Sequence, residues 1–153
     1  MKKKLSPLFL VGLIFLSSCA TIETYESMPQ QENLLLTAPI NGKIFEIFKY
    51  EDLPNVFGKK DIYGGKKDTG LTSLRFLGIN SKGNILLRLN DIEIYSNASV
   101  FTRYGDAPEN TLTPQSTTDL EFDFSVNKIL DLEYIKVEFV EVTSTKVSYY
   151  LRK

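Results

Sequence analysis

Apolar and polar residues alternate with a period of two along much of the C-terminal third of the chain. Between residues 119 and 126 every second side chain is apolar, and the side chains between them are acidic or hydroxylated. Such alternation predicts a strand with one buried face. The apolar positions are Leu120, Phe122, Phe124 and Val126.

Two further segments near the C-terminus have the same alternation. Residues 132–142 place Ile135, Val137 and Phe139 on one face, and the apolar phase then shifts to Val140 and Val142. A shift of phase within a strand predicts a β-bulge near Phe139. The last predicted strand spans residues 146–151, and its inward side chains are Val147, Tyr149 and Leu151.

The middle of the chain predicts a hairpin. Residues 71–79 and 85–89 are rich in apolar side chains, and the Asn-Ser-Lys-Gly-Asn segment between them has the turn chemistry that joins antiparallel strands. Further strands are expected at residues 92–95 and 100–104. Residues 105–118 contain two prolines and many threonines, which favours a loop.

The first strand of the domain is expected at residues 43–50, which are rich in Phe and Ile. No segment keeps a helical period over three turns. Many short strands separated by polar turns predict an all-β fold, either a small antiparallel β-sandwich or a barrel. The sequence leaves the choice between these two architectures open.

A different pattern opens the chain. Three lysines at positions 2–4 precede an apolar stretch at residues 5–16, and the small residues Ser17 and Ser18 follow it. This order is that of a secretory signal peptide. The apolar stretch is shorter than the ~20 residues that a membrane-spanning helix needs, so we expect a leader that is cleaved.

The leader ends in Leu16-Ser17-Ser18-Cys19, an aliphatic residue and two small residues directly before a cysteine. This segment resembles the lipobox of bacterial lipoproteins. The resemblance implies that Cys19 is lipidated, that signal peptidase II cuts between Ser18 and Cys19, and that acyl chains such as palmitate anchor the protein to a membrane. The alternative is an ordinary secreted protein with an incidental cysteine.

The expected chain therefore has three parts. Residues 1–18 form the signal peptide, residues 19–39 form the lipidated cysteine and a polar tether, and residues 40–153 form a single β-rich domain. Ala20 is not the aspartate associated with inner-membrane retention, so the resemblance implies the outer membrane if the cell is Gram-negative. The sequence leaves open the Gram type, and whether the domain faces the periplasm or the outside.

Charge and cysteine content narrow the functional classes. Residues 1–18 include three of the 18 Lys and Arg and none of the 19 Asp and Glu, so the remaining side chains carry a net charge of −4. This balance argues against nucleic-acid binding, which needs a basic surface. Because Cys19 is the only cysteine, the domain must fold without a disulfide.

The chain contains no histidine, which excludes Ser-His-acid and Cys-His catalysis and histidine metal sites. Catalysis by a pair of carboxylates remains the alternative. Most acidic residues, however, alternate with apolar ones and are interpreted as the solvated faces of strands. We therefore predict no enzyme activity, no cofactor and no metal site.

The tetrapeptide Gly-Lys-Lys-Asp occurs twice, at residues 58–61 and 65–68. Residues 58–82 contain six Lys and Arg against two Asp, whereas residues 109–141 contain two Lys against eight acidic residues. We interpret the basic stretch as solvated loops, or alternatively as a contact with an anionic surface beside the anchor. The candidate contact residues are Lys59, Lys60, Lys66 and Lys67.

Together these features predict a membrane-anchored bacterial lipoprotein whose β-domain is a binding or assembly module of the cell envelope. The expected partners are the membrane, through the N-terminal lipid, and an envelope protein or polymer. A lipid-anchored enzyme that uses carboxylates alone is the alternative. The sequence does not identify the partner or the oligomeric state.

Overall fold

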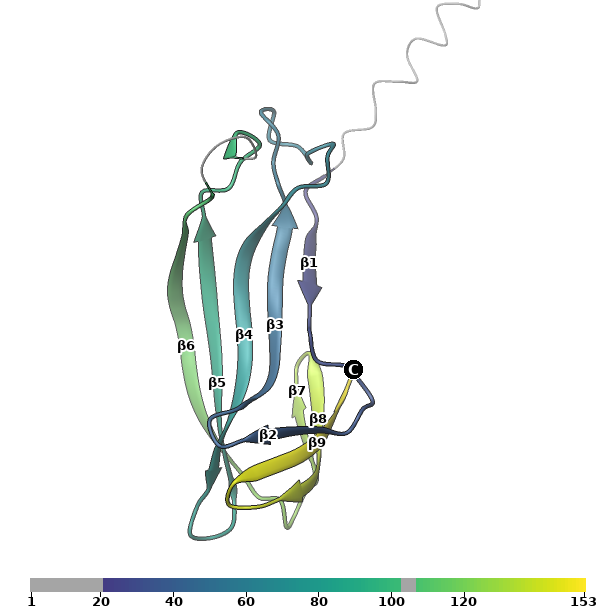
Figure 1. Ribbon diagram of the computed structural model, residues 1–153, viewed down its shortest axis with the longest axis vertical. Helices are drawn as coiled ribbons and strands as arrows, with labels where there is room; N and C mark the ends of the chain where they lie inside the picture. Colours follow the sequence, from purple (N-terminus) through teal and green to yellow (C-terminus); the bar gives the residue numbers. More distant parts are fainter. Residues whose placement is uncertain (1–20, 103–106) are drawn as a thin grey trace, which may run out of the picture.

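The computed structural model describes residues 21–102 and 107–153, and these residues form nine β-strands and no α-helix. The strands make two antiparallel sheets that pack together as a small β-sandwich (Figure 1). The predicted all-β class is therefore confirmed. The leader, Cys19 and Ala20 lie outside the described residues, so the predictions made on them stay predictions.

The larger sheet, here called the long sheet, has the strand order β1-β3-β4-β5-β6. Its strands are β1 (Thr24–Ser27), β3 (Lys43–Asp52), β4 (Lys66–Ile79), β5 (Ile85–Ser96) and β6 (Asn110–Phe122). The smaller sheet, here called the short sheet, has the order β2-β9-β8-β7. Its strands are β2 (Leu36–Pro39), β7 (Ile129–Leu132), β8 (Ile135–Val142) and β9 (Lys146–Arg152).

The core lies where the short sheet covers one half of the long sheet. The fully buried side chains of the long sheet include Phe45, Leu74 and Phe76, and those of the short sheet include Val137 and Leu151. These side chains come from strands that are far apart in sequence. Burial of their apolar surface is the main force that holds the two sheets together.

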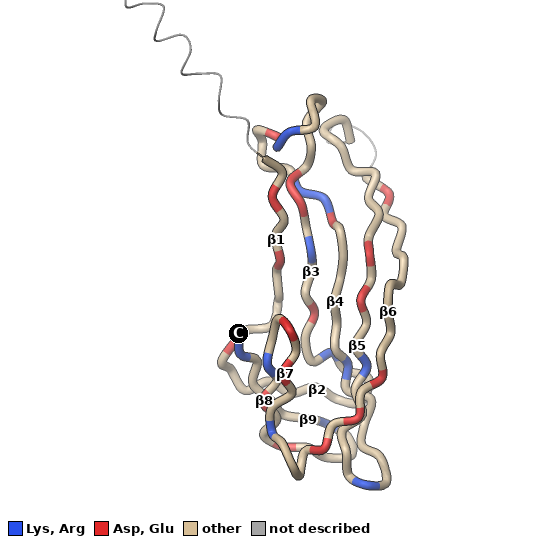
Figure 2. The backbone as a smooth tube through the Cα atoms, turned by 180° about the vertical axis from the view of Figure 1, so that it is seen from behind, with Lys and Arg blue, Asp and Glu red and all other residues tan. Residues whose placement is uncertain are grey.

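The other half of the long sheet extends beyond the short sheet, as Figure 2 shows from behind. β4 has 14 residues and β5 has 12, whereas β8 has 8 and β9 has 7. Along β5, side chains change from buried at Ile85 to partly exposed near Ser96. The inner face of the long sheet is therefore only half covered, and this uncovered half carries the candidate site.

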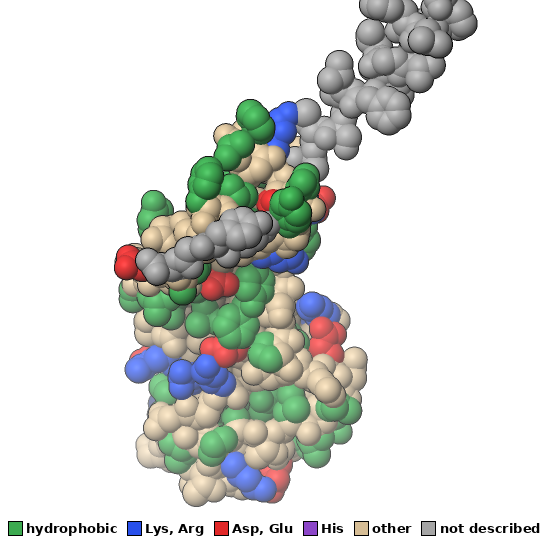
Figure 3. Space-filling view, turned by 45° about the horizontal axis from the view of Figure 1, so that its top comes forward, with side chains coloured by type: hydrophobic (Ala, Val, Ile, Leu, Met, Phe, Trp, Pro, Cys, Tyr) green, Lys and Arg blue, Asp and Glu red, His purple; other side chains and the backbone are tan. Residues whose placement is uncertain are grey.

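The uncovered half ends in two loops, residues 53–65 and 97–102, which we call the tip. Exposed apolar side chains gather at this end of the molecule (Figure 3). The opposite end of the long sheet holds the hairpin between β4 and β5. This hairpin was predicted correctly, since Ile79 pairs with Ile85 and the amide of Asn80 donates to the carbonyl of Asn84 at 3.0 Å.

The predicted bulge in β8 is also confirmed. The register between β8 and β9 shifts between Phe139 and Glu141, which leaves Val140 without a cross-strand partner and partly exposed. Ile135, Val137 and Phe139 point into the core, as their alternation indicated. The extra residue explains why the apolar phase of the sequence changes at this point.

The folded part of the chain begins earlier than the expected boundary at residue 40. Residues 24–27 of the expected tether form β1 and pair with β3, and residues 36–39 form β2 and pair with β9. Both strands lie at sheet edges, where backbone hydrogen bonds hold them and most of their side chains remain exposed. Strands of this kind need not show an apolar alternation, which is why the sequence pattern predicted a tether at these residues.

Two expectations in the region 100–118 are wrong. Residues 110–118, expected as a loop, belong to β6, the second edge strand of the long sheet. Pro114 is tolerated there because the strand is at an edge and the register shifts beside it, since Pro114 pairs with Ile92 while Ser116 pairs with Asp91. Residues 100–102 form a turn instead of the expected strand, and residues 103–106 lie outside the described part.

Candidate functional site

The uncovered half of the long sheet forms one wall of a groove of about 590 Å³. The opposite wall is the turn between β7 and β8, which contributes Glu133 and Tyr134. This volume is within the range typical of small-ligand sites. The groove is lined by Glu26, Ile47, Lys49, Thr72, Leu89, Asp91, Ser116, Leu132, Glu133 and Tyr134.

A row of cross-strand partners forms the floor of the groove. Ile47 pairs with Thr72, Thr72 with Asp91, and Asp91 with Ser116, so the row crosses β3, β4, β5 and β6. Residues directly opposite each other in a sheet point to the same face. The row therefore presents one apolar side chain, two hydroxyls and a carboxylate to the groove.

Lys49, Thr72 and Asp91 are joined by hydrogen bonds. The Thr72 hydroxyl donates to Asp91 Oδ1 at 2.7 Å, and Lys49 Nζ lies 3.1 Å from the same oxygen. The hydrogen bond from Thr72 lowers the pKa of Asp91; desolvation opposes this shift, and Lys49 adds to it. Asp91 is therefore ionised at neutral pH.

Gly70 gives Lys49 the space to reach Asp91. A Cβ atom at Gly70 would lie 3.3 Å from Cδ of Lys49 and 3.1 Å from the backbone oxygen of Ile92. Gly70 is also the direct cross-strand partner of Lys49. The aliphatic part of the Lys49 side chain thus lies close over Gly70, and glycine permits this contact because it has no Cβ atom.

Carboxylates outnumber cations in the groove. Glu26, Asp91 and Glu133 face the single ammonium group of Lys49, which gives the lining a net charge of −2. Figure 2 shows this arrangement, with acidic positions on β1, β5 and the β7–β8 turn around the basic position on β3. The groove therefore favours a ligand that carries positive charge.

Tyr134 lies at the rim of the groove, with its ring edge against Phe45 at a centroid distance of 6.2 Å. Partial burial raises the pKa of Tyr134, and the charges of Asp91, Glu133 and Glu26 add to this shift. Its hydroxyl is therefore a neutral hydrogen-bonding group beside the carboxylates. An aromatic face with a polar group at its end suits both apolar and polar contacts.

The groove residues can form ion pairs and hydrogen bonds with a ligand. A general acid at neutral pH needs a raised carboxyl pKa, whereas the pKa of Asp91 is lowered. Among residues 21–102 and 107–153, no group of three or more Asp, Glu, His or Cys side chains is arranged to hold a metal ion. What the groove offers is ion pairing, hydrogen bonding and a partly apolar floor.

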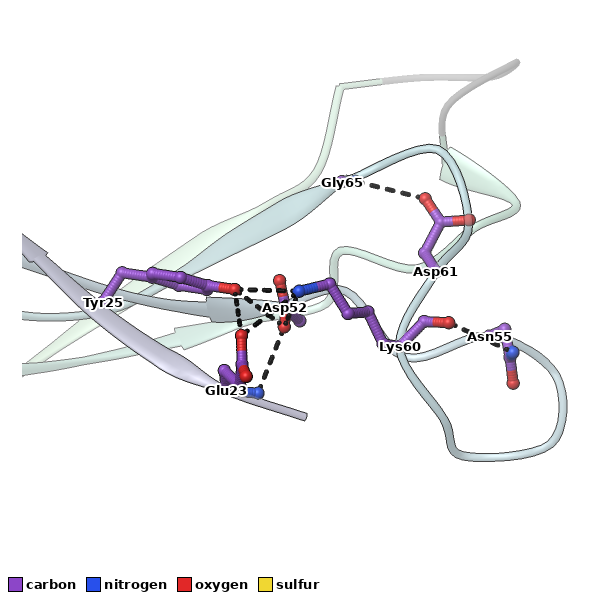
Figure 4. A network of polar contacts seen from close by, with 7 residues as sticks. All are labelled: Glu23, Tyr25, Asp52, Asn55, Lys60, Asp61 and Gly65. Atoms are coloured by element: carbon purple, nitrogen blue, oxygen red, sulfur yellow. Dashed lines mark hydrogen bonds and ion pairs between the residues drawn. The ribbon is translucent and has the colours of Figure 1, made fainter. Parts of the chain in front are cut away.

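The four lysines proposed for contact with an anionic surface lie near the tip, and Lys60 is enclosed by partners (Figure 4). Lys60 Nζ lies 3.0 Å from Asp52, 3.3 Å from Glu23 and 3.0 Å from the Tyr25 hydroxyl. These hydrogen bonds, with that to Tyr25 contributing most, raise the pKa of Lys60. The network ties β1 to the loop at 53–65.

Asp52 is the buried member of this network, with its side chain 1% exposed. Desolvation alone would raise the pKa of Asp52, but hydrogen bonds from Lys60, the backbone of Glu23 and Tyr25 outweigh it and lower the pKa. A buried carboxylate needs such partners to remain charged. The role that the structure gives Lys60 is therefore internal support.

Lys66 and Lys67 also make contacts within the domain. Lys67 Nζ lies 2.7 Å from Glu51, and Lys66 Nζ lies 3.6 Å from the centroid of the Tyr25 ring. Lys59 has its backbone amide bound to the side chain of Asn55 at 3.1 Å. The structure thus brings three of the four lysines near Tyr25 and the end of β3, and contact with an anionic surface stays a prediction.

The groove residues were missed in the sequence because they come from different strands. Lys49 and Asp91 are 42 positions apart, and Thr72 and Asp91 are 19 apart. One signal was present: Asn90 and Asp91 interrupt the apolar stretch of β5. A charged residue within a strand pattern marks a face that is not part of the core.

No model of a known protein family, no curated protein and no solved structure matches this chain. Within residues 21–102 and 107–153, no helix is both long and apolar enough to cross a membrane.

Proposed function

We propose that this protein is a lipid-anchored binding module of the bacterial cell envelope, and that the groove on the uncovered half of the long sheet is its binding site. The anchor is supported by the Leu16-Ser17-Ser18-Cys19 segment. The observation that carries the binding function is the groove itself, an open site of about 590 Å³ with an ionised Asp91 held in place.

The groove suits a ligand with a positively charged group, such as a basic peptide segment of an envelope protein. Three carboxylates against one ammonium attract a cation. The apolar floor at Ile47 and Leu89 accommodates the aliphatic part of a Lys or Arg side chain. The hydroxyls of Thr72 and Ser116, in the same cross-strand row as Asp91, can form further hydrogen bonds with a ligand.

The binding function is tested with short peptide probes of opposite charge. Pentalysine and pentaglutamate are titrated into isotope-labelled protein, and amide chemical shifts are followed by NMR. We expect shifts in residues of the groove with pentalysine and none with pentaglutamate, and weaker binding at high salt, since exposed charges are screened.

Asp91→Asn removes one groove charge and is expected to weaken pentalysine binding. The matched control is Glu141→Gln, which removes one charge from an exposed residue of the short sheet outside the groove. Equal binding by both variants and the wild type, or equal shifts over the whole surface, would exclude the groove as the binding site.

The anchor is tested separately by mass spectrometry of the membrane fraction. We expect an acylated cysteine at position 19 as the N-terminal residue, and loss of the protein from the membrane in Cys19→Ser. A soluble protein that is cut elsewhere and carries a free thiol would refute the anchor.

A further inference from the structure

The tip exposes five large apolar side chains. Phe57 is 83% exposed and Ile62 is 85% exposed, and Val56, Tyr63 and Phe101 are also largely exposed. Figure 3 shows hydrophobic side chains gathered at this end of the molecule. Contiguous apolar surface of this kind marks an interaction site.

The side chains at the tip form one surface. A hollow of about 250 Å³ is lined mostly by apolar groups from both tip loops, together with Asn55 and Asp61. Its lining is Asn55, Val56, Phe57, Asp61, Ile62, Tyr63 and Val100. The lining has few polar groups, so this surface favours contact with an apolar partner.

The loop that carries these side chains is held in a defined conformation. The Asn55 side-chain oxygen accepts hydrogen bonds from the amides of Phe57 at 2.9 Å and Lys59 at 3.1 Å. The amide of Asp61 donates to the carbonyl of Leu53 at 2.9 Å, which closes the loop. The loop therefore presents its apolar side chains outward instead of folding them onto the core.

The N-terminal end of the described chain lies at the base of the tip. The amide of Asp52 donates to the carbonyl of Glu23 at 2.9 Å, and the amide of Glu23 donates to Asp52 Oδ2 at 3.1 Å. Lys60, within the tip loop, is bonded to Glu23 as well (Figure 4). Thr21 is two residues before Glu23, and Cys19 is two residues before Thr21.

We propose that the tip is a membrane-contacting surface, in which Phe57, Ile62 and Tyr63 enter the headgroup region of the bilayer that holds the anchor. This inference rests on the proposed lipidation of Cys19. Two residues span at most about 7 Å, so a lipid on Cys19 places Thr21, and with it the tip, at the membrane surface. Aromatic residues favour this interface because they combine an apolar ring with polar contacts.

Contact through the tip would set the orientation of the whole domain. The long sheet extends from the tip to the β4–β5 hairpin, so its strands would point away from the membrane surface. Lys66 begins β4 and Thr72 lies in the groove six residues later, a distance of about 20 Å along a strand. The groove would then be clear of the headgroups and open to a partner.

The test uses the full-length protein, extracted from membranes and reconstituted in vesicles of phosphatidylethanolamine and phosphatidylglycerol. An environment-sensitive fluorophore is attached at Ile62→Cys, and the control protein carries it at Val126→Cys. Val126 is 83% exposed and follows β6 at the opposite end of the long sheet. Quenchers attached to lipid acyl chains report which label reaches the bilayer.

We expect a blue shift and strong quenching for the Ile62 label, with little change for the Val126 label. Equal, weak quenching of both labels on vesicle-bound protein would overturn the tip contact while leaving the anchor intact. Protein that does not float with the vesicles, and that carries label on Cys19, would refute the anchor and the tip contact together. A shift of the Ile62 label that depends on protein concentration without vesicles would assign the tip to self-association instead. Binding at the groove is measured independently with the peptide probes.

Discussion

The hydroxyl of Tyr149 joins the two sheets through the core. It donates a 2.7 Å hydrogen bond from β9 to the backbone carbonyl of Ile44 on β3. Ile44 is the residue skipped by the register between β3 and β4, because Lys43 pairs with Arg75 and Phe45 pairs with Leu74. The carbonyl of a bulged, fully buried residue thus obtains its hydrogen bond from a side chain of the opposite sheet.

Replacing Tyr149 by Phe keeps the ring and removes this bond. The buried carbonyl of Ile44 then loses a partner that no neighbouring strand supplies in register. Leaving such an acceptor unsatisfied costs about 2 kcal/mol of the free energy of unfolding. We expect the urea midpoint at pH 7 to fall by the corresponding amount, with an unchanged slope of the transition.

The pH dependence of stability provides a second, independent test of the role of the Tyr149 hydroxyl. Burial raises the pKa of Tyr149 to about 12 from its ordinary value of 10.0. A raised pKa means that folding favours the neutral hydroxyl, so its contribution is complete below pH 10 and is lost as the pH rises toward 12. At pH 11 the wild type loses about 1.4 kcal/mol through this group, and Tyr149→Phe does not.

The difference in stability between wild type and Tyr149→Phe is therefore expected to be larger at pH 7 than at pH 11. Urea unfolding followed by circular dichroism at both pH values measures it. Tyr150→Phe, the neighbouring residue on the same strand, is the control for general effects of losing a tyrosine hydroxyl. Equal stability of Tyr149→Phe and wild type at pH 7, or a difference that does not change with pH, would refute this account of the sheet interface.

Three further substitutions probe the network, the groove and the core. Lys60→Met leaves the Asp52 carboxylate without its cation, so we expect a loss of stability at pH 7. Because the pKa of Asp52 is lowered in the folded state, this loss should shrink as the pH falls below 3.8 and the carboxylate becomes protonated. Urea midpoints at pH 7 and pH 3 measure it. Gly70→Val places a Cβ atom 3.3 Å from Lys49 Cδ and 3.1 Å from a backbone oxygen, and is expected to cost about 1–3 kcal/mol in urea unfolding. Phe76→Ala empties a fully buried position, and we expect a loss of about 3–5 kcal/mol by the same measurement.

Each of these substitutions has a matched control. Lys136→Met breaks an exposed pair with Asp131 and is expected to change stability little. Thr113→Val places a valine on the exposed edge strand β6, where it only exchanges a hydroxyl for a methyl group, and Phe57→Ala truncates an exposed ring. Both variants are expected to stay within about 0.5 kcal/mol of wild type. A control that is as destabilised as its partner variant would show that the proposed contact is not the cause.

The sequence pattern correctly predicted those elements that depend on residues close together in the chain. The turn at residues 80–84 follows from Asn and Gly at positions that close a hairpin, and the bulge after Phe139 follows from a change of apolar phase within one strand. The inward faces of β8 and β9 were also correct, because each of these strands buries one face against the long sheet.

The edge strands could not be predicted in this way. β1 and most of β6 have exposed side chains, so no apolar alternation marks them. What orders them is backbone pairing with β3 and β5, whose residues are distant in sequence. For the same reason the sequence did not show the partners of Lys60. Glu23 lies just before β1, and Asp52 is the last residue of β3.

The sequence by itself determined the strand class, the central hairpin, the bulge in β8 and the inward residues of the last two strands. The tertiary structure decided the strand order of both sheets, the excess length of the long sheet over the short one, and hence the groove and the tip. The physical reason is that alternation shows that a face is buried but not what buries it. Which faces remain uncovered depends on how strands of unequal length pair across long sequence separations, and the candidate site lies on such an uncovered face.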